Sequence, residues 1–136
     1  MSAVVLHADA SDNAQATLSW LQSPESKVSY HVLIDRNGDV YQCVPVALRA
    51  WHAGVSEFEG VKNVNDFSIG LSFANKNDGK EKYTPAQIMS ASELCREWMA
   101  LFPKITKDRV TTHAIVAPGR KTDPLGFDLA AFKGML

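Results

Sequence analysis

A chain of 136 residues, with 46% hydrophobic residues and a formal net charge of −1, has the size and composition of one soluble globular domain. The near-neutral charge argues against a protein that holds nucleic acid non-specifically, because such binding needs a basic face. No apolar run approaches the roughly 18 residues of a membrane span, and the N-terminus lacks the basic start and apolar segment of a secretory signal. We expect a protein made in a cytoplasm without a signal peptide, with residues 1–136 as its single domain.

The first expected elements are a strand and a helix. Residues 3–7 are short and rich in valine, which predicts a buried strand. Residues 11–22 predict a helix, with Ser11 or Asp12 as its N-cap. Its apolar residues are Ala16, Leu18, Trp20 and Leu21.

A hairpin is the clearest local feature of the sequence. Residues 29–44 contain two strand-like runs on either side of Asn37 and Gly38. Both residue types tolerate the positive φ of a type I′ turn, so we expect that turn at the tip. Residues 67–74 predict a further strand, which Gly70 interrupts.

The best-marked helix covers residues 84–102. Thr84 can cap it, Pro85 suits its first position, and Gln87 completes a capping box. Apolar residues then recur every three or four positions, which predicts a stripe that packs on the core. The stripe consists of Ile88, Ala91, Leu94, Trp98 and Leu101.

The chain should close with a strand at residues 109–114 and a helix at residues 127–136. Strands and helices are interspersed, and at least one pair of strands forms a hairpin. The expected fold class is therefore α/β: a single domain with a central mixed β-sheet flanked by helices. Cys43 and Cys95 do not suggest a disulfide framework, and we expect both to be buried free thiols.

The four histidines each lie beside a strand-like run or a turn. A histidine in such a place is more often a hydrogen-bonded structural residue than a ligand. No compact metal motif, such as two histidines one helical turn apart, is present. Spacing alone therefore does not identify a metal site.

The chemistry of one loop is more informative. Residues 112–124 hold His113, Lys121 and Asp123 in a loop that Pro118 and Pro124 stiffen, and His7 ends the first expected strand. Two imidazoles and one carboxylate suit a catalytic zinc ion, which keeps a fourth position open for water. A nearby lysine can stabilise a developing oxyanion. From the residues alone, metal-assisted hydrolysis is one interpretation and a purely structural loop is the simpler one.

Several segments resemble zinc-dependent N-acetylmuramoyl-L-alanine amidases, the group that includes certain bacteriophage lysozymes, peptidoglycan-recognition proteins and cytosolic recycling amidases. The similarity covers nearly the whole chain and keeps the order of the family. It implies a mixed sheet with helices on its faces and a zinc cleft along one side. The segments are "VVLHADAS", "SYHVLIDRNGDVYQCVP", "AWHAG", "NDFSIGLSFAN", "YTPAQ" and "THAIVAPGRKTDP".

The resemblance implies that His7, His113 and Asp123 bind one Zn²⁺ ion. The aspartate stands where the phage lysozymes have a cysteine, and both are accepted third ligands. Tyr30 matches a tyrosine near the metal, and Lys121 matches a lysine two residues before the third ligand. We expect these two residues to be catalytic.

His52 and Arg120 match residues of the cleft, and we expect them to bind substrate. For Arg120 a solvated surface charge is the stronger alternative. Tyr30 has the alternative of an ordinary hairpin tyrosine. His31 also fits the family pattern, but we interpret it as structural.

Ser72 departs from the recycling amidases, which carry a glutamate at this place in the strand. That glutamate is assigned proton transfer, and a serine without an activating partner cannot replace it as a base. Phage lysozymes and recognition proteins also lack it. Ser72 therefore argues against a close recycling enzyme and leaves the general base open.

The resemblance implies a peptidoglycan hydrolase that cleaves the amide between the lactyl group of N-acetylmuramic acid and L-alanine, with zinc-activated water as nucleophile. The alternative is a peptidoglycan-binding module of the same fold without turnover. Expected partners are peptidoglycan and muropeptides, with no nucleic acid, and the chain should be a monomer. A phage endolysin that acts on the host cell wall is the first expectation for its setting. A recycling enzyme and an exported effector are the alternatives.

Overall fold

The computed structural model describes residues 1–136 and contains a five-stranded mixed sheet in the order β3-β2-β6-β1-β7. Strands β1, β6 and β7 run parallel, as do β2 and β6, and β3 pairs antiparallel with β2. The expected mixed sheet is confirmed. The strands are β1 (Ala3–Ala8), β2 (Val32–Ile34), β3 (Val40–Gln42), β6 (Ser68–Phe73) and β7 (Val110–Thr112).

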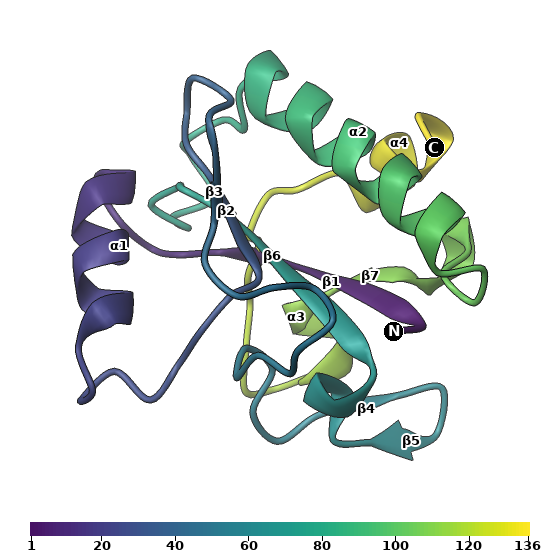
Figure 1. Cartoon of the computed structure of the whole chain (residues 1–136). Helices are drawn as coiled ribbons and strands as arrows, with labels where there is room; N and C mark the ends of the chain where they lie inside the picture. Colours follow the sequence, from purple (N-terminus) through teal and green to yellow (C-terminus); the bar gives the residue numbers. More distant parts are fainter.

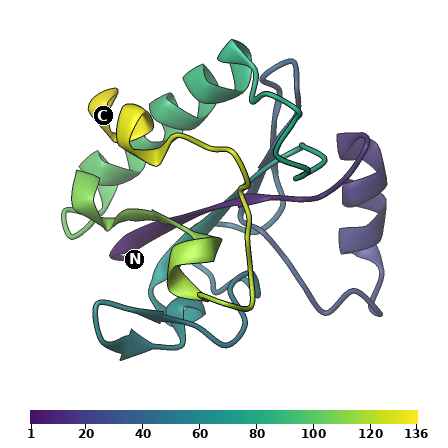
Figure 2. The same ribbon diagram turned by 180° about the vertical axis from the view of Figure 1, so that it is seen from behind.

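Helices lie on both sides of this sheet, as expected for the α/β class (Figures 1 and 2). The long helix α2 and the C-terminal α4 cover one side, while α3 and a small hairpin of β4 and β5 lie on the other. The helices are α1 (Ala14–Gln22), α2 (Pro85–Leu101), α3 (His113–Val116) and α4 (Leu129–Gly134). Shorter elements are β4 (Glu57–Phe58), β5 (Val61–Lys62) and the 3₁₀ turns η1 (Val64–Asp66) and η2 (Lys107–Arg109).

The central strand β1 divides its side chains between two different environments. Because side chains alternate along a strand, Val4 and Leu6 enter the large core beneath α2, whereas Val5 packs in a smaller cluster on the opposite face. His7 follows Val5 onto that face, in register with Ser72 of β6. The sheet therefore has an apolar face under α2 and a face that carries polar groups.

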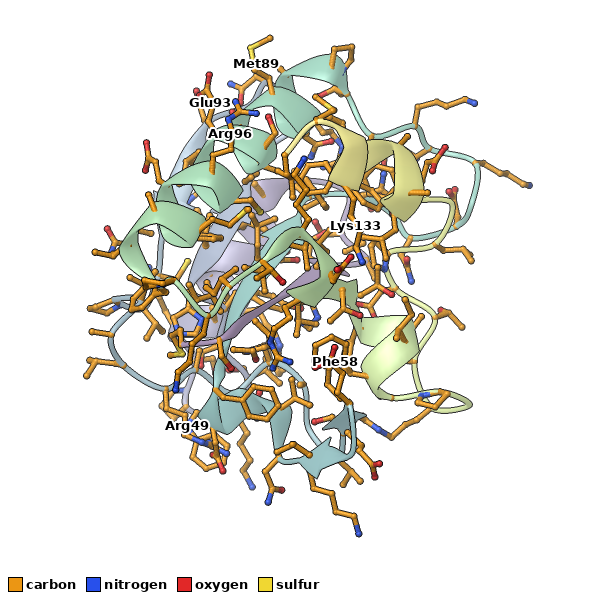
Figure 3. The ribbon with its side chains drawn as sticks, turned by 90° about the vertical axis from the view of Figure 1, so that its right-hand side faces the viewer. Arg49, Phe58, Met89, Glu93, Arg96 and Lys133 are labelled. Carbon is orange, nitrogen blue, oxygen red and sulfur yellow. The ribbon has the colours of Figure 1, made fainter.

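Helix α2 confirms the expected capping box. The Thr84 hydroxyl accepts the backbone N–H of Gln87, and the Gln87 side chain accepts the N–H of Thr84. Met89, Glu93 and Arg96 project away from the sheet (Figure 3), so the outer side of α2 carries two charged side chains and one exposed methionine. Leu101 is 64% exposed, so its place in the apolar stripe was wrong, because the helix ends there and leaves the core.

The N-cap predicted for α1 was wrong. Asn13, not Ser11 or Asp12, caps α1 by accepting the N–H of Ala16. The Ser11 hydroxyl instead donates to the carboxylate of Asp9, which also binds the Thr17 hydroxyl.

The hairpin exists, but its turn is not type I′. The Gly38 N–H bonds to the carbonyl of Asp35, and the Asp35 N–H bonds to the carbonyl of Asp39. Gly38 has φ of 88°, and Asn37 does not have positive φ. This is a three-residue loop that closes with a glycine, the next most common hairpin geometry.

The structure also bears on the two cysteines and on the expected absence of a membrane span. Both cysteines are free, with Cys95 buried, but Cys43 is exposed because it lies just beyond the edge strand β3. No helix in the structure combines the length and the apolar character needed to cross a membrane.

Gln87 connects α2 to the sheet, and its loss should be costly. Its Nε2 donates to the carbonyls of Ile34 and Ala74 at 3.1 and 2.9 Å, inside the protein. Gln87→Ala removes both bonds and half of the capping box, so we expect the free energy of unfolding to fall by about 2–3 kcal/mol in urea titrations. The control Gln15→Ala, at an exposed position of α1, should change it by less than about 0.5 kcal/mol. Equal effects of the two changes would contradict this role.

Candidate metal centre

The candidate centre lies where β1 and β7 end side by side. His7 is the penultimate residue of β1, and His113 follows β7 directly as the first residue of α3. Asp123 ends the loop after α3, and its carbonyl accepts the N–H of Ala114 at 2.9 Å. Because β1 and β7 are parallel, their carboxyl ends lie at one edge of the sheet, the edge where such folds bind ligands.

Three potential ligand atoms converge at this edge. The Nδ1 atoms of His7 and His113 are 3.1 Å apart. The carboxylate oxygens of Asp123 lie 3.3 Å from Nδ1 of His7 and 3.0 Å from Nδ1 of His113. Ligand atoms around a tetrahedral zinc ion are about 3.3 Å apart, given Zn–N and Zn–O distances of roughly 2.1 Å. The donor types and their separations therefore fit a divalent cation.

The surroundings set the protonation of His7 and Asp123. His7, His113 and Asp123 are 0%, 5% and 8% exposed. Burial, assisted by the nearby His113, lowers the pKa of His7 to about 4, so its imidazole is neutral at neutral pH. Burial alone would raise the pKa of Asp123, but the two imidazoles hold it well below its usual range. A neutral imidazole beside an ionised carboxylate is the state that a metal ion requires.

The outer nitrogens of both imidazoles bond to one short segment. Nε2 of His7 lies 3.0 Å from Nδ1 of His52, and Nε2 of His113 lies 3.1 Å from the carbonyl of Ala53. Two consecutive residues, His52 and Ala53, thus hold two rings that are far apart in the sequence. Both rings turn Nδ1 towards Asp123.

A cavity of about 440 Å³ opens over the centre. His52, His113 and Asp123 contribute to its wall. Other polar and aromatic residues around it are Tyr30, Trp51, Asn65, Asn77, Arg120 and Lys121. The structure therefore brings the predicted catalytic and substrate-binding residues to one cavity.

Tyr30 lies beside the metal-ligand candidates. Its ring centroid is 5.2 Å from that of His7. Burial and the negative charge of Asp123 raise the pKa of Tyr30, so the phenol keeps its proton at any physiological pH. Ser72, in register with His7 on the neighbouring strand, has a buried hydroxyl without a hydrogen-bond partner.

Lys121 and Arg120 occupy the loop that precedes Asp123, and both are exposed. Nη2 of Arg120 donates to the carbonyls of Ala53 and Val55 at 2.5 and 2.8 Å. Arg120 therefore ties this loop to the segment that supports the imidazoles, which gives it more than the role of a solvated charge.

His52 is placed differently from a residue that reaches out to substrate. It is only 6% exposed, and its Nδ1 and Nε2 contact His7 and Ser68. His31, interpreted as structural, accepts the N–H of Gly70 and bonds to the carbonyl of Leu48.

Asn65 is a supporting residue that the sequence did not reveal. Its Oδ1 accepts the N–H groups of His52 and Ala53 at 3.1 and 2.8 Å, which fixes the backbone of that segment. Only its position within "NDFSIGLSFAN" marked it, and nothing in that motif indicated what it would contact.

Comparison with known proteins decides the family. The family described as N-acetylmuramoyl-L-alanine amidase matches residues 1–126. The chain belongs to the N-acetylmuramoyl-L-alanine amidase family. It is 46% identical over 100 residues to 1,6-anhydro-N-acetylmuramyl-L-alanine amidase AmpD of Haemophilus influenzae, a match that covers 74% of this chain and 53% of that protein. The chain thus spans about half the length of the curated relatives it matches.

Solved structures of amidases agree with this fold. Escherichia coli AmiD, in complex with the substrate anhydro-N-acetylmuramic acid-L-Ala-D-gamma-Glu-L-Lys, superimposes with a TM-score of 0.88 at 31% identity, over 99% of this chain and 57% of that chain. An endolysin from Bacillus subtilis gives a TM-score of 0.74 at 22% identity, over 98% of this chain and 84% of that chain. The endolysin similarity shows a shared fold alone.

The stability of this amidase-family chain, freed of metal, should depend on pH through His7. The folded protein holds the pKa of His7 at about 4, against an ordinary 6.5, so the unfolded chain binds more protons between these values. Stability is therefore full above about pH 6.5 and falls as the pH drops towards 4, by on the order of 3 kcal/mol from His7. Urea titrations of chelator-treated protein across this range measure the loss. In His7→Gln the slope should be shallower, and an unchanged slope would exclude His7 as its source.

Proposed function

We propose that the chain hydrolyses the amide between the lactyl group of N-acetylmuramic acid and L-alanine of the stem peptide. The observation that carries this proposal is the convergence of His7, His113 and Asp123 at ligand spacing beneath a cavity, in a chain of the amidase family. AmpD, its 46% identical relative, is named for that amide in 1,6-anhydro muropeptides.

His7, His113 and Asp123 would hold one zinc ion. The chemistry supplied by a divalent ion at such a set is polarisation of the scissile carbonyl and a lowered pKa of water. Two neutral imidazoles and one carboxylate leave the set with one negative charge, so the ion would keep a net positive charge that favours a developing oxyanion.

Tyr30 and Lys121 would act on the reacting carbonyl from the walls of the cavity. Because burial keeps the Tyr30 phenol protonated, it is a hydrogen-bond donor to the oxyanion and not a base. Lys121 brings a cationic group to the same cavity, two residues from Asp123. Arg120 uses Nη2 to hold the loop, which leaves its Nη1 and Nε for a substrate carboxylate.

Ser72 limits how protons move in this site. Its hydroxyl lies beside Tyr30 and has no carboxylate or imidazole bonded to it that would make it a base. We therefore assign proton delivery to the leaving amine to solvent in the cavity, and not to residue 72.

Anhydro-muropeptides are the first substrates to test, because AmpD and AmiD are named with them. A phage endolysin would instead need to cut the intact cell wall. The endolysin setting has the support of the fold alone, and a monomeric state remains a prediction.

Metal removal should abolish turnover. We expect chelator-treated protein to leave a defined anhydro-muropeptide intact and added Zn²⁺ to restore release of the L-alanine peptide, read by mass spectrometry. Asp123→Ala should lower kcat/KM at least 100-fold, because only two ligands remain. Full activity of metal-free protein would exclude the mechanism. Zinc-loaded protein that binds the muropeptide without hydrolysing it would instead be the peptidoglycan-binding module without turnover. Parallel digestion of purified cell walls tests the endolysin setting.

Lys121 should act on the transition state more than on binding. We expect Lys121→Ala to lower kcat about 100- to 1,000-fold, the usual effect of losing one oxyanion contact, with KM changed less than about threefold. Lys104→Ala, at an exposed position in the loop after α2 and outside the cavity lining, is the matched control. A rise in KM alone would make Lys121 a substrate-binding residue.

A further inference from the structure

His52 lies behind the metal-ligand candidates and touches the outer edge of one of them. The His7 and His52 rings meet edge to face, with centroids 5.0 Å apart and planes at 89°. Both ring nitrogens of His52 have polar partners inside the protein, which leaves neither for a substrate. This arrangement suits a residue that acts through His7.

A chain of hydrogen bonds behind His7 has only one consistent direction. It ends at the carbonyl of Val64, which can only accept, and the Ser68 hydroxyl lies 2.6 Å from it. Since the single hydroxyl proton of Ser68 goes to Val64, its oxygen must accept at the 3.2 Å contact with Nε2 of His52.

The same logic then fixes the two imidazoles. With its proton on Nε2, a neutral His52 has a bare Nδ1, which accepts Nε2–H of His7 at 3.0 Å. A neutral His7 that carries its proton on Nε2 has a bare Nδ1, and this is the atom that faces Asp123. One backbone carbonyl, three links away, thus selects the nitrogen that His7 offers to the centre.

The His52 ring is held firmly enough for this task. Its backbone N–H is fixed by Asn65, and its ring packs on the backbone of β6 at Gly70. A Cβ at Gly70 would lie 2.5–2.8 Å from the His52 ring atoms, closer than any real contact. Gly70 is therefore the residue that lets His52 reach His7.

From this geometry we propose that His52 is a positioning residue, which with Ser68 fixes the tautomer and orientation of His7 so that Nδ1 can bind the metal ion. The proposal deepens the function above and rests on it for the identity of the metal site. Outer partners of this kind orient metal-binding histidines in general, and their loss weakens metal affinity about 10- to 100-fold.

The test measures Zn²⁺ affinity of the full chain by competition with a chromophoric chelator. His52→Leu, which offers no acceptor, should bind Zn²⁺ about 10- to 100-fold more weakly. His52→Asn places Oδ1 where Nδ1 stands and should stay within about threefold of wild type. This rescue separates positioning from simple packing, because leucine is the better match for a buried apolar space.

Gly70→Ala should disturb the contact between His52 and His7 without changing either residue, since its methyl group displaces the His52 ring. We expect weaker Zn²⁺ binding than wild type, whereas Gly134→Ala, where an added Cβ meets nothing within 4 Å, should bind normally. Equal affinities of these two variants would count against the proposal, and so would equal affinities of the leucine and asparagine variants.

Nitrogen-15 NMR of the metal-free wild type gives a readout that needs neither metal nor substituted protein. We expect His7 to carry its proton on Nε2, and a proton on Nδ1 would overturn the proposal even if His52→Leu failed to fold. If the wild type shows this tautomer but binds no Zn²⁺, the proposed metal function fails while the hydrogen-bond chain stands. The two conclusions are therefore tested separately.

Discussion

The parallel pairing of β1 with β7 is the constraint on which the site depends. Its register joins Leu6 to Thr112, so the next residues, His7 and His113, emerge side by side although 106 positions separate them. A slip of one residue would turn the His7 side chain into the apolar core beneath α2. The ligand geometry is thus set by strand register, and register is set by the apolar residues that alternate with the polar ones.

The two faces of the sheet divide the work of folding and chemistry. The larger core, between the sheet and α2, supplies most of the apolar burial. The other face carries His7, Ser68 and Ser72 in buried positions, where polar groups lower stability unless they are bonded. Such a polar face is tolerable because the stabilising core lies on the opposite side. Extensive changes near the cavity should therefore leave the fold intact more often than changes beneath α2.

Much of the fold could be read from the sequence, because the strands and α2 carry strong local patterns. Thr84, Pro85 and Gln87 formed the capping box that their spacing indicates. The N-cap of α1 could not be predicted, because the Ser11 hydroxyl donates to the carboxylate of Asp9, which follows β1. The type of turn at Gly38 likewise depends on how Asp35 pairs with Asp39, and the sequence Asn37-Gly38 does not specify that pairing.

The candidate site was predictable only in part, and for a different reason. The residue types of one loop and of His7 made a metal site one interpretation, but the ligand set was assigned from a family resemblance, since no spacing in the chain marks it. Which contacts each would make could not be foreseen. His52 was expected to touch substrate, yet its neighbours are residues that approach it from β1 and β6. The role of Asn65 could not be predicted, because its side chain accepts hydrogen bonds from two backbone N–H groups, and no pattern of side chains indicates such contacts.

Ser72 shows how a single strand position can be left open to change. A buried hydroxyl that bonds to nothing lowers stability, by about 1–3 kcal/mol for a group of this kind, so alanine there would be tolerated. The same hydroxyl lies beside Tyr30 and in register with His7, so a side chain at position 72 points to the face of the sheet that carries the metal-ligand candidate. A substitution at this one position of β6 would change the polarity next to His7 without altering His7, His113 or Asp123 themselves.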